Sequence, residues 1–180
     1  MKSIKKSIFF MLLFTSILTV SATASDGTIS FSGGIVASTC IIKLNGVSAS
    51  GTVTMPWVAL NLLATTGNIA AATNFTLNLS GCTTVTGATL VNAFFESGAG
   101  VNNSTGNLIN TGTATNVAVQ LLVAGTMAQI IPGLATQAQP ASVSIPGGTG
   151  TLAYVAQYIS TGVATAGTIV SSVTYSLTYQ

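Results

Sequence analysis

The sequence predicts an all-β protein, either a sandwich or a barrel, and three observations lead to this fold class. Many short runs alternate apolar and polar residues with a period of two, as strands with one buried face do. Gly, Asn and Thr separate these runs at fairly even intervals, which is typical of the turns in a sandwich or barrel. No stretch carries the apolar period of a long helix. The 180-residue chain is long enough for one such domain with its own core.

Residues 1–24 differ in composition from the rest of the chain and are interpreted as a signal peptide. Three of the first six residues are lysine, and residues 8–20 form an apolar run. Small residues follow at 22–24, where a signal peptidase would cleave. An uncleaved membrane anchor is the alternative, but the apolar run is shorter than the roughly 20 residues that span a bilayer. We therefore expect a mature chain that begins at Ser25.

The first strand expected in the mature chain, residues 27–35, has one apolar face. The residues on that face are Gly27, Ile29, Phe31, Gly33 and Ile35. Little of the mature chain precedes this strand to pair with it. It is either a terminus or edge strand of its own domain, or a strand that enters another molecule.

Further strands are predicted along the rest of the chain. They cover residues 36–44, 51–55, 72–82, 89–96, 116–123, 152–159 and 173–180. The strand at 72–82 has Phe75, Leu77 and Leu79 on one face, which predicts a half-buried strand. The strand at 116–123 is apolar on both faces, which predicts an interior position in its sheet.

The connecting segments are predicted mainly as loops. Residues 58–66 form a loop with a short helix as the competing interpretation, because their apolar residues could cover one face of a helical turn or two. The Gly- and Asn-rich residues 97–106 are predicted as an exposed loop. Residues 130–150 contain three of the four prolines and are predicted mainly as loop, with a short strand around Val143 and Ile145.

The last predicted strand, residues 173–180, is as regularly patterned as the first. The residues on its apolar face are Val173, Tyr175, Leu177 and Tyr179. Ser and Thr residues occupy the other face, so the pattern predicts a strand that packs one face on the core and can still present its edge.

Cys40 and Cys82 are the two cysteines of the chain. An even number of cysteines in an exported protein predicts a disulfide bond. In the chain-entropy model, a loop of this size corresponds to about 4 kcal/mol of stabilisation. The bond implies a periplasmic or extracellular setting.

Very few residues of the mature chain are charged. Lys43 is its one base, and Asp26 and Glu96 are its acids, so its net charge is minus one. The chain contains no His, and all four of its basic residues are lysine. Nucleic-acid binding needs clustered Lys or Arg, and catalysis or metal binding needs titratable groups, so neither is expected. We predict no enzyme activity, no catalytic residue, no metal site and no cofactor.

Several segments form a recognisable series when they are taken in chain order. They are Gly-Thr-Ile-Ser-Phe-Ser-Gly-Gly-Ile-Val before Cys40, Asn-Phe-Thr-Leu-Asn-Leu-Ser-Gly-Cys at 74–82, Ala-Thr-Asn-Val-Ala-Val-Gln-Leu-Leu at 114–122, Ala-Gln-Tyr at 156–158 and the terminal Tyr-Gln. In their order and spacing, these segments resemble the pilin subunits of chaperone–usher fimbriae, in particular the type 1 fimbrial subunits of Gram-negative bacteria. The resemblance extends from the opening strand to the last residue.

The resemblance implies an incomplete immunoglobulin-like β-sandwich that lacks its final strand and therefore has an open apolar groove. In this family, a periplasmic chaperone fills the groove first. At the outer-membrane usher, the N-terminal arm of the next subunit replaces the chaperone, which is donor-strand complementation. The implied organisation is a signal peptide at 1–24, a donor-strand extension at 25–39 and a pilin domain at 40–180.

The family's functional positions carry over to residues of this chain. Ile29, Phe31 and Ile35 would fill the groove of the next subunit, Gly33 would lie where the family places a small residue, and Gly27 would lie at the outer end of the arm. Cys40 and Cys82 match the family disulfide. Tyr179 matches the penultimate aromatic residue of the family. The closing strand that the chaperone grips would present Val173, Tyr175, Leu177, Tyr179 and the carboxylate of Gln180.

The implied function is that of a structural subunit of an adhesive fimbria at the cell surface, reached through the periplasm. The implied partners are identical or related pilin subunits, a periplasmic chaperone and an outer-membrane usher, without nucleic acid or stable membrane insertion. The arm is short, which leaves a rod role and a linking role both open. The alternatives are a small outer-membrane β-barrel, which would need strands of about ten residues, and a secreted sugar-binding sandwich, which would need no donor arm.

Overall fold

The computed structural model describes residues 29–32, 40–83 and 88–180, and their regular structure is almost entirely β. The chain divides into two units, Met1–Ile35 and Val36–Gln180. In the first unit, residues 29–32 form no regular element. The second unit contains ten strands and two short 3-10 helices among the described residues. None of the helices in these ranges is long and apolar enough to cross a membrane.

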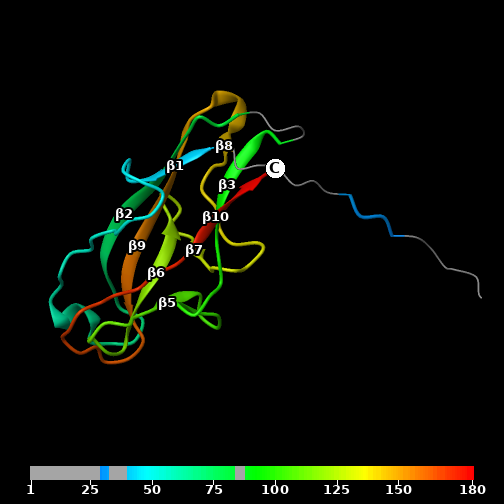
Figure 1. Ribbon diagram of the computed structural model, residues 1–180. Helices are drawn as coiled ribbons and strands as arrows, with labels where there is room; N and C mark the ends of the chain where they lie inside the picture. The colour runs from blue at the N-terminus through cyan, green and yellow to red at the C-terminus, as the bar shows by residue number, and fades with distance from the viewer. Residues whose placement is uncertain (1–28, 33–39, 84–87) are drawn as a thin grey trace, which may run out of the picture. The chain divides into compact units, whose positions relative to one another are not determined.

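The larger sheet of the second unit is antiparallel and has seven strands (Figure 1). Its order is β1 (Ile41–Leu44), β2 (Ile69–Ser80), β9 (Gly150–Ser160), β6 (Val117–Val123), β5 (Asn107–Ile109) and β4 (Val101–Asn102), and β7 (Gln129–Ile130) pairs with β6. Strand β6 is interior and buried on both faces, as its apolar pattern predicts.

The smaller sheet has three strands, in the order β10 (Tyr175–Tyr179), β3 (Leu90–Phe95) and β8 (Val143–Ser144). Strand β10 pairs with β3 along its whole length, from Tyr175 opposite Phe95 to Tyr179 opposite Val91. No strand of the described residues pairs with the other edge of β10. The two sheets form a sandwich, which confirms the predicted fold class.

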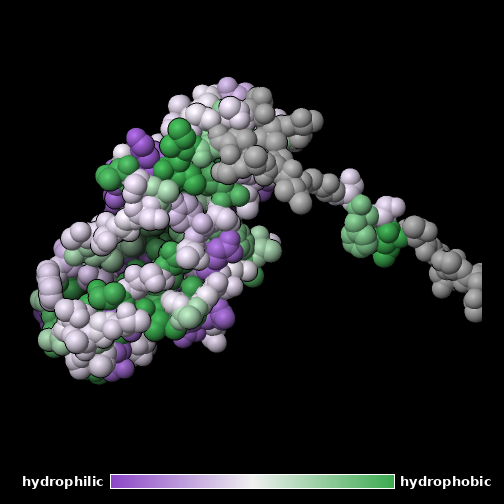
Figure 2. Space-filling view, viewed as in Figure 1, coloured by the Kyte–Doolittle hydropathy of each residue, from purple (hydrophilic) through white to green (hydrophobic). Residues whose placement is uncertain are grey.

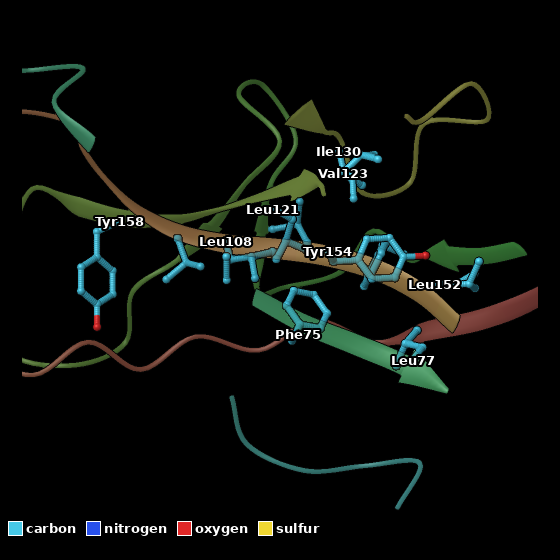
Figure 3. Close-up of a cluster of buried hydrophobic side chains, with 14 of the residues drawn as sticks. Phe75, Leu77, Leu108, Leu121, Val123, Ile130, Leu152, Tyr154 and Tyr158 are labelled. Atoms are coloured by element: carbon cyan, nitrogen blue, oxygen red, sulfur yellow. The ribbon is translucent and has the colours of Figure 1, made fainter. Parts of the chain in front are cut away.

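The core lies between the sheets and consists of the inward-facing residues of both (Figure 3). Phe75, Leu77 and Leu79 of β2 are buried, as their alternation predicts. At the centre, the ring of Tyr154 stacks on Phe75 with a centroid distance of 5.4 Å and meets the ring of Phe95 edge-on at 5.1 Å. Such aromatic pairs add to the stabilisation that burial of their area provides.

Most predicted elements are confirmed, with shifted ends. The predicted strands at 72–82, 89–96, 116–123, 152–159 and 173–180 correspond to β2, β3, β6, β9 and β10, and β8 confirms the short strand at Val143. The helical alternative within 58–66 corresponds to the 3-10 helix η1 (Leu60–Leu63). Of the strand predicted at 36–44, the structure shows β1, and residues 36–39 lie outside the described ranges.

Two predictions from the pattern are wrong. The exposed loop predicted at 97–106 contains the short strand β4, which pairs with β5. The strand predicted at 51–55 is not a strand. Its alternation is real, because Val53 and Met55 are half-buried against the core, but its backbone pairs with no described residue. A period of two reports which side chains turn inward and does not report whether a partner strand exists.

Candidate functional site

A groove of about 950 Å³ opens between two segments of the sandwich. Its rims are residues 49–58, which we call the first rim, and residues 164–175, which we call the second rim. Its floor consists of apolar core side chains from both sheets, Phe75, Leu77, Phe95, Leu108, Val117, Val119, Leu121, Ala156 and Tyr158. In the space-filling view, apolar side chains lie in a hollow bordered by more polar chain (Figure 2). The core of this domain is therefore accessible along the groove.

The first rim is extended and has no backbone partner. Val53, Met55 and Val58 turn toward the core, and Thr52 and Thr54 turn outward. No backbone N–H or C=O of residues 51–58 makes a hydrogen bond to another described residue. Because backbone groups that are neither paired nor solvated cost free energy, this edge is suited to accept a strand.

Residues 168–173 of the second rim are hydrogen-bonded to the domain along one edge only. The C=O groups of Thr168 and Val170 accept hydrogen bonds from the N–H groups of Ala114 and Thr111, at 3.0 and 2.8 Å. The N–H of Val170 donates to the side chain of Asn110 at 2.8 Å. Thr168 and Val170 therefore direct their backbone groups toward residues 110–114.

Between residues 169 and 173, the odd-numbered residues of the second rim direct their backbone groups the other way. The N–H and C=O groups of Ile169, Ser171 and Val173 make no hydrogen bond to another described residue. In an extended chain, alternate residues present their backbone groups to opposite edges. The free edge of the second rim therefore faces the groove, and the groove has an unpaired edge on each side.

The two ends of the groove differ. Tyr175 and Leu77 line one end, together with Leu44 at the end of β1, and we call it the disulfide end because Cys82 follows β2 there. Trp57, Leu60 and Tyr158 line the other end, which we call the η1 end. The register of β2 with β9 sets this direction, because Leu77 lies opposite Leu152 and Ala70 lies opposite Tyr158.

The predicted closing strand lies along the disulfide end of the groove. Val173 and Tyr175 line the groove, and Leu177 and Tyr179 are half-buried on β10. The backbone of the terminal Gln180 pairs with Leu90, and its C=O also accepts from Thr89 at 2.6 Å. Burial raises the pKa of Tyr175, so its hydroxyl stays protonated and can donate.

The predicted donor residues are described only in part. Ile29 is 81% exposed and Phe31 is 93% exposed. Gly27, Gly33 and Ile35 lie outside the described ranges. Covering such exposed apolar side chains with a partner would be favourable, by roughly 25 cal/mol per Å² of apolar surface removed from water.

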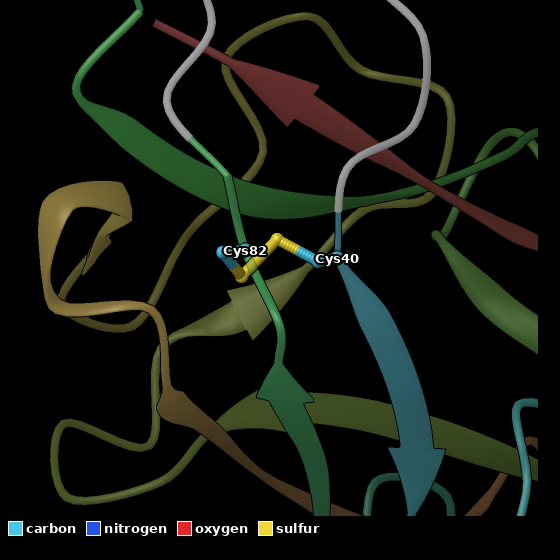
Figure 4. The surroundings of a disulfide bond; sticks show 2 residues. All are labelled: Cys40 and Cys82. Carbon is cyan, nitrogen blue, oxygen red and sulfur yellow. A yellow bond between two sulfur atoms is a disulfide. The ribbon is translucent and has the colours of Figure 1, made fainter.

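The predicted disulfide joins Cys40 and Cys82 (Figure 4). Cys40 immediately precedes β1, and Cys82 follows β2, so the bond links the starting point of one strand to the end of its neighbour. Cys40 is therefore held at the disulfide end of the sandwich.

The described residues offer little reactive chemistry. They contain no group of three His, Cys, Asp or Glu side chains that could hold a metal ion. The side chain of Glu96 accepts a hydrogen bond from the hydroxyl of Ser176 at 2.6 Å, and Lys43 is exposed on β1. What the groove offers instead is apolar surface and unpaired backbone, which are the requirements for binding an extended peptide.

Sequence reasoning did not find the two rims. Residues 51–55 were predicted as an ordinary strand, and 164–172 carried no prediction of function. The signal for the first rim is the alternation of Val53 and Met55 that ends at Pro56, which has no N–H to donate. The second rim has a weaker signal, because Ile169, Ser171 and Val173 alternate only partly.

Comparison with known proteins identifies the family. The type-1 fimbrial protein A family profile matches residues 55–180. The chain belongs to this family. It is 44% identical to the F17 fimbrial protein of Escherichia coli, over 97% of this chain and 99% of the relative. It is 39% identical to the major fimbrial subunit SMF-1 of Stenotrophomonas maltophilia, over 89% of this chain and 96% of that one.

A solved structure supports the fold independently. The crystal structure of the P pilus rod subunit PapA aligns with 79% of this chain and 100% of its own length, with a TM-score of 0.59 at 20% identity. At this identity the likeness concerns the fold alone. Family membership implies a non-enzymatic structural subunit of a surface fimbria, exported through the periplasm and assembled with other pilin subunits.

Proposed function

We propose that this fimbrial subunit polymerises by donor-strand complementation, with its groove accepting the N-terminal arm of a neighbouring subunit. The observation that carries the proposal is the groove itself, an apolar channel with an unpaired backbone edge on each side. A bound extended strand could pair with both rims while its alternate side chains enter the floor. A small-molecule ligand would leave both edges unpaired.

The arm at residues 27–35 has the properties of the missing strand. Its apolar face carries Ile29, Phe31 and Ile35, and nine extended residues span about 30 Å. Each backbone hydrogen bond to a rim would contribute about 1 kcal/mol, and burial of the exposed Ile29 and Phe31 would add to this. By the family resemblance, Gly33 would lie at the position where the family places a small residue.

An open groove also requires protection before assembly, because exposed apolar surface and unpaired edges promote aggregation. The proposed route is therefore cleavage of the signal peptide at 1–24, capture of the groove and of the closing strand by a periplasmic chaperone, and exchange for the arm at an outer-membrane usher. Val173, Tyr175, Leu177, Tyr179 and Gln180 are the proposed chaperone contacts. The proposed division of the mature chain is a donor extension at 25–39 and a pilin domain at 40–180.

The experiment compares Gly33→Leu with Gly34→Leu in cells that assemble fibres. Gly33 is on the apolar face of the arm and Gly34 is on the opposite face, so only the first leucine would enter the groove. We expect Gly33→Leu to abolish or shorten sheared fibres while periplasmic subunit levels stay normal, and Gly34→Leu to assemble nearly as wild type. Fibres of normal length from Gly33→Leu would contradict the role of Gly33.

A further inference from the structure

Apolar side chains are exposed at the η1 end of the groove, and strand insertion alone does not account for them. Trp57 is 83% exposed, and Leu60, Leu62 and Val163 are exposed as well. The N–H of Ala164 donates to the C=O of Leu63, which places Val163 beside η1. We call Trp57, Leu60, Leu62 and Val163 the η1 patch. Neither charged residue of the described ranges lies in it, since Lys43 is on β1 and Glu96 follows β3.

We propose that the η1 patch contacts the body of the donor subunit, a second copy of this chain, in the assembled fibre. This inference rests on the proposed function and adds a contact between folded domains to the contact made by the arm. Trp57 and Leu60 line the groove, so the patch is continuous with the surface that the arm would occupy.

The length of the chain between arm and domain limits where the donor body can lie. Four residues, 36–39, join Ile35 to Cys40, and this stretch reaches at most about 18 Å when fully extended. The donor body therefore lies directly against the end of the groove at which the arm emerges. One end of each filled groove must be covered by a second domain.

The position of Cys40 decides which end is covered. In every copy, the chain enters the described part of the domain at Cys40, which is bonded to Cys82 at the disulfide end (Figure 4). If the donor placed this end against the disulfide end of the acceptor, the same surface would meet on both copies, and the contact would close at two subunits. A fibre requires two different surfaces to meet, so the disulfide end of the donor faces the η1 end of the acceptor.

Each of the two surfaces that meet in this arrangement has an exposed apolar side chain. The acceptor contributes the η1 patch, with Trp57 as its largest side chain. The donor contributes the beginning of β1, where Ile41 is exposed next to Cys40. A buried tryptophan at the centre of such a contact typically carries a large share of its binding energy.

Intrinsic fluorescence tests this contact in the wild-type protein, because Trp57 is the one tryptophan of the chain. The mature subunit saturated with a synthetic peptide of residues 25–39 has a filled groove and no donor body. Assembled fibres have a filled groove and a donor body beside it. We expect acrylamide to quench Trp57 several-fold less efficiently in fibres than in the peptide-filled subunit, with a blue shift of the emission maximum.

The outcomes separate this inference from the proposed function. Fibres in which Trp57 is as quenchable as in the peptide-filled subunit would overturn the η1 contact and leave strand insertion intact. Failure of the peptide to bind would overturn the proposed function itself.

As a second measurement, Trp57→Asp should lower the temperature at which fibres dissociate in detergent. Leu134→Asp, which changes an exposed apolar residue outside both the groove and the η1 patch, should not. Equal dissociation temperatures would contradict the contact.

Discussion

The hydroxyl of Tyr175 donates a hydrogen bond to the backbone C=O of Ala49 at 2.6 Å. The two residues belong to opposite rims, so this bond joins the rims across the disulfide end of the groove. The first rim has no other polar contact to the second rim among the described residues. The Tyr175 side chain therefore links the two rims at this end of the groove.

Tyr175→Phe removes that bond and keeps the ring. Because the bond is exposed, we expect the free energy of unfolding of the subunit to fall by about 0.5 to 1 kcal/mol, with faster amide exchange in residues 49–58. Tyr158→Phe is the matched control, since the Tyr158 hydroxyl lines the groove without a hydrogen bond to a described residue. Chemical denaturation and hydrogen exchange of both variants make the comparison. An equal loss in both would show that the Ala49 bond contributes nothing specific.

The buried Tyr154 hydroxyl leads to a prediction of how the free energy of unfolding depends on pH. Its side chain is fully buried, its hydroxyl has no hydrogen-bond partner among the described residues, and burial raises its pKa above the ordinary value of 10.0. The folded state therefore holds this proton more tightly than the unfolded state. Stability should be nearly constant up to about pH 10 and decline as the pH rises further.

Tyr154→Phe should remove much of that alkaline decline. It also removes a buried polar group without a partner, so we expect the free energy of unfolding at pH 7 to rise by about 1 kcal/mol. Thermal unfolding of wild type and variant between pH 7 and pH 11 measures both effects. A variant that is less stable at pH 7 would show that the hydroxyl has a favourable interaction, such as with a bound water molecule.

Gly112 holds the second rim close to its neighbour. A Cβ added at Gly112 would come within 2.2 Å of the C=O of Thr168, so an alanine must push the rim away. We expect Gly112→Ala to lower the free energy of unfolding by about 1 to 3 kcal/mol and to weaken binding of the 25–39 peptide. Gly98→Ala is the control, because a Cβ there meets nothing within 4 Å. Calorimetry measures the affinity for the peptide. If Gly112→Ala binds the peptide as tightly as wild type, the position of the second rim does not matter for binding.

Much of the fold could be predicted from alternation, because alternation reports burial. Residues 72–82 and 116–123 are predicted as strands because apolar residues recur at every second position. In the structure, Phe75 and Leu121 of these runs are buried. The strands β4, β5 and β7 have only two or three residues each, which is too short for a pattern to emerge. The disulfide could be predicted because the chain has just two cysteines.

The groove could not be predicted from the residue pattern alone, because it depends on which backbone edges remain unpaired in the folded sheets. Val53 and Met55 alternate like the residues of any strand, and only the structure shows that the backbone between them is unpaired. The exposure of Trp57 could not be predicted for the same reason. Its exposure at one end of the groove is a property of tertiary arrangement, and no local pattern encodes it.

The most direct test of strand donation is photo-crosslinking from the arm. A benzoylphenylalanine at Phe31, in fibres grown from a mixture of ¹⁵N-labelled and unlabelled chains, reports by mass spectrometry which residues lie against it and in which copy. Donor-strand complementation predicts adducts with residues 51–58 or 166–174, or with the groove floor, of a different chain. Adducts confined to the same chain, or to surfaces outside the groove, would contradict it.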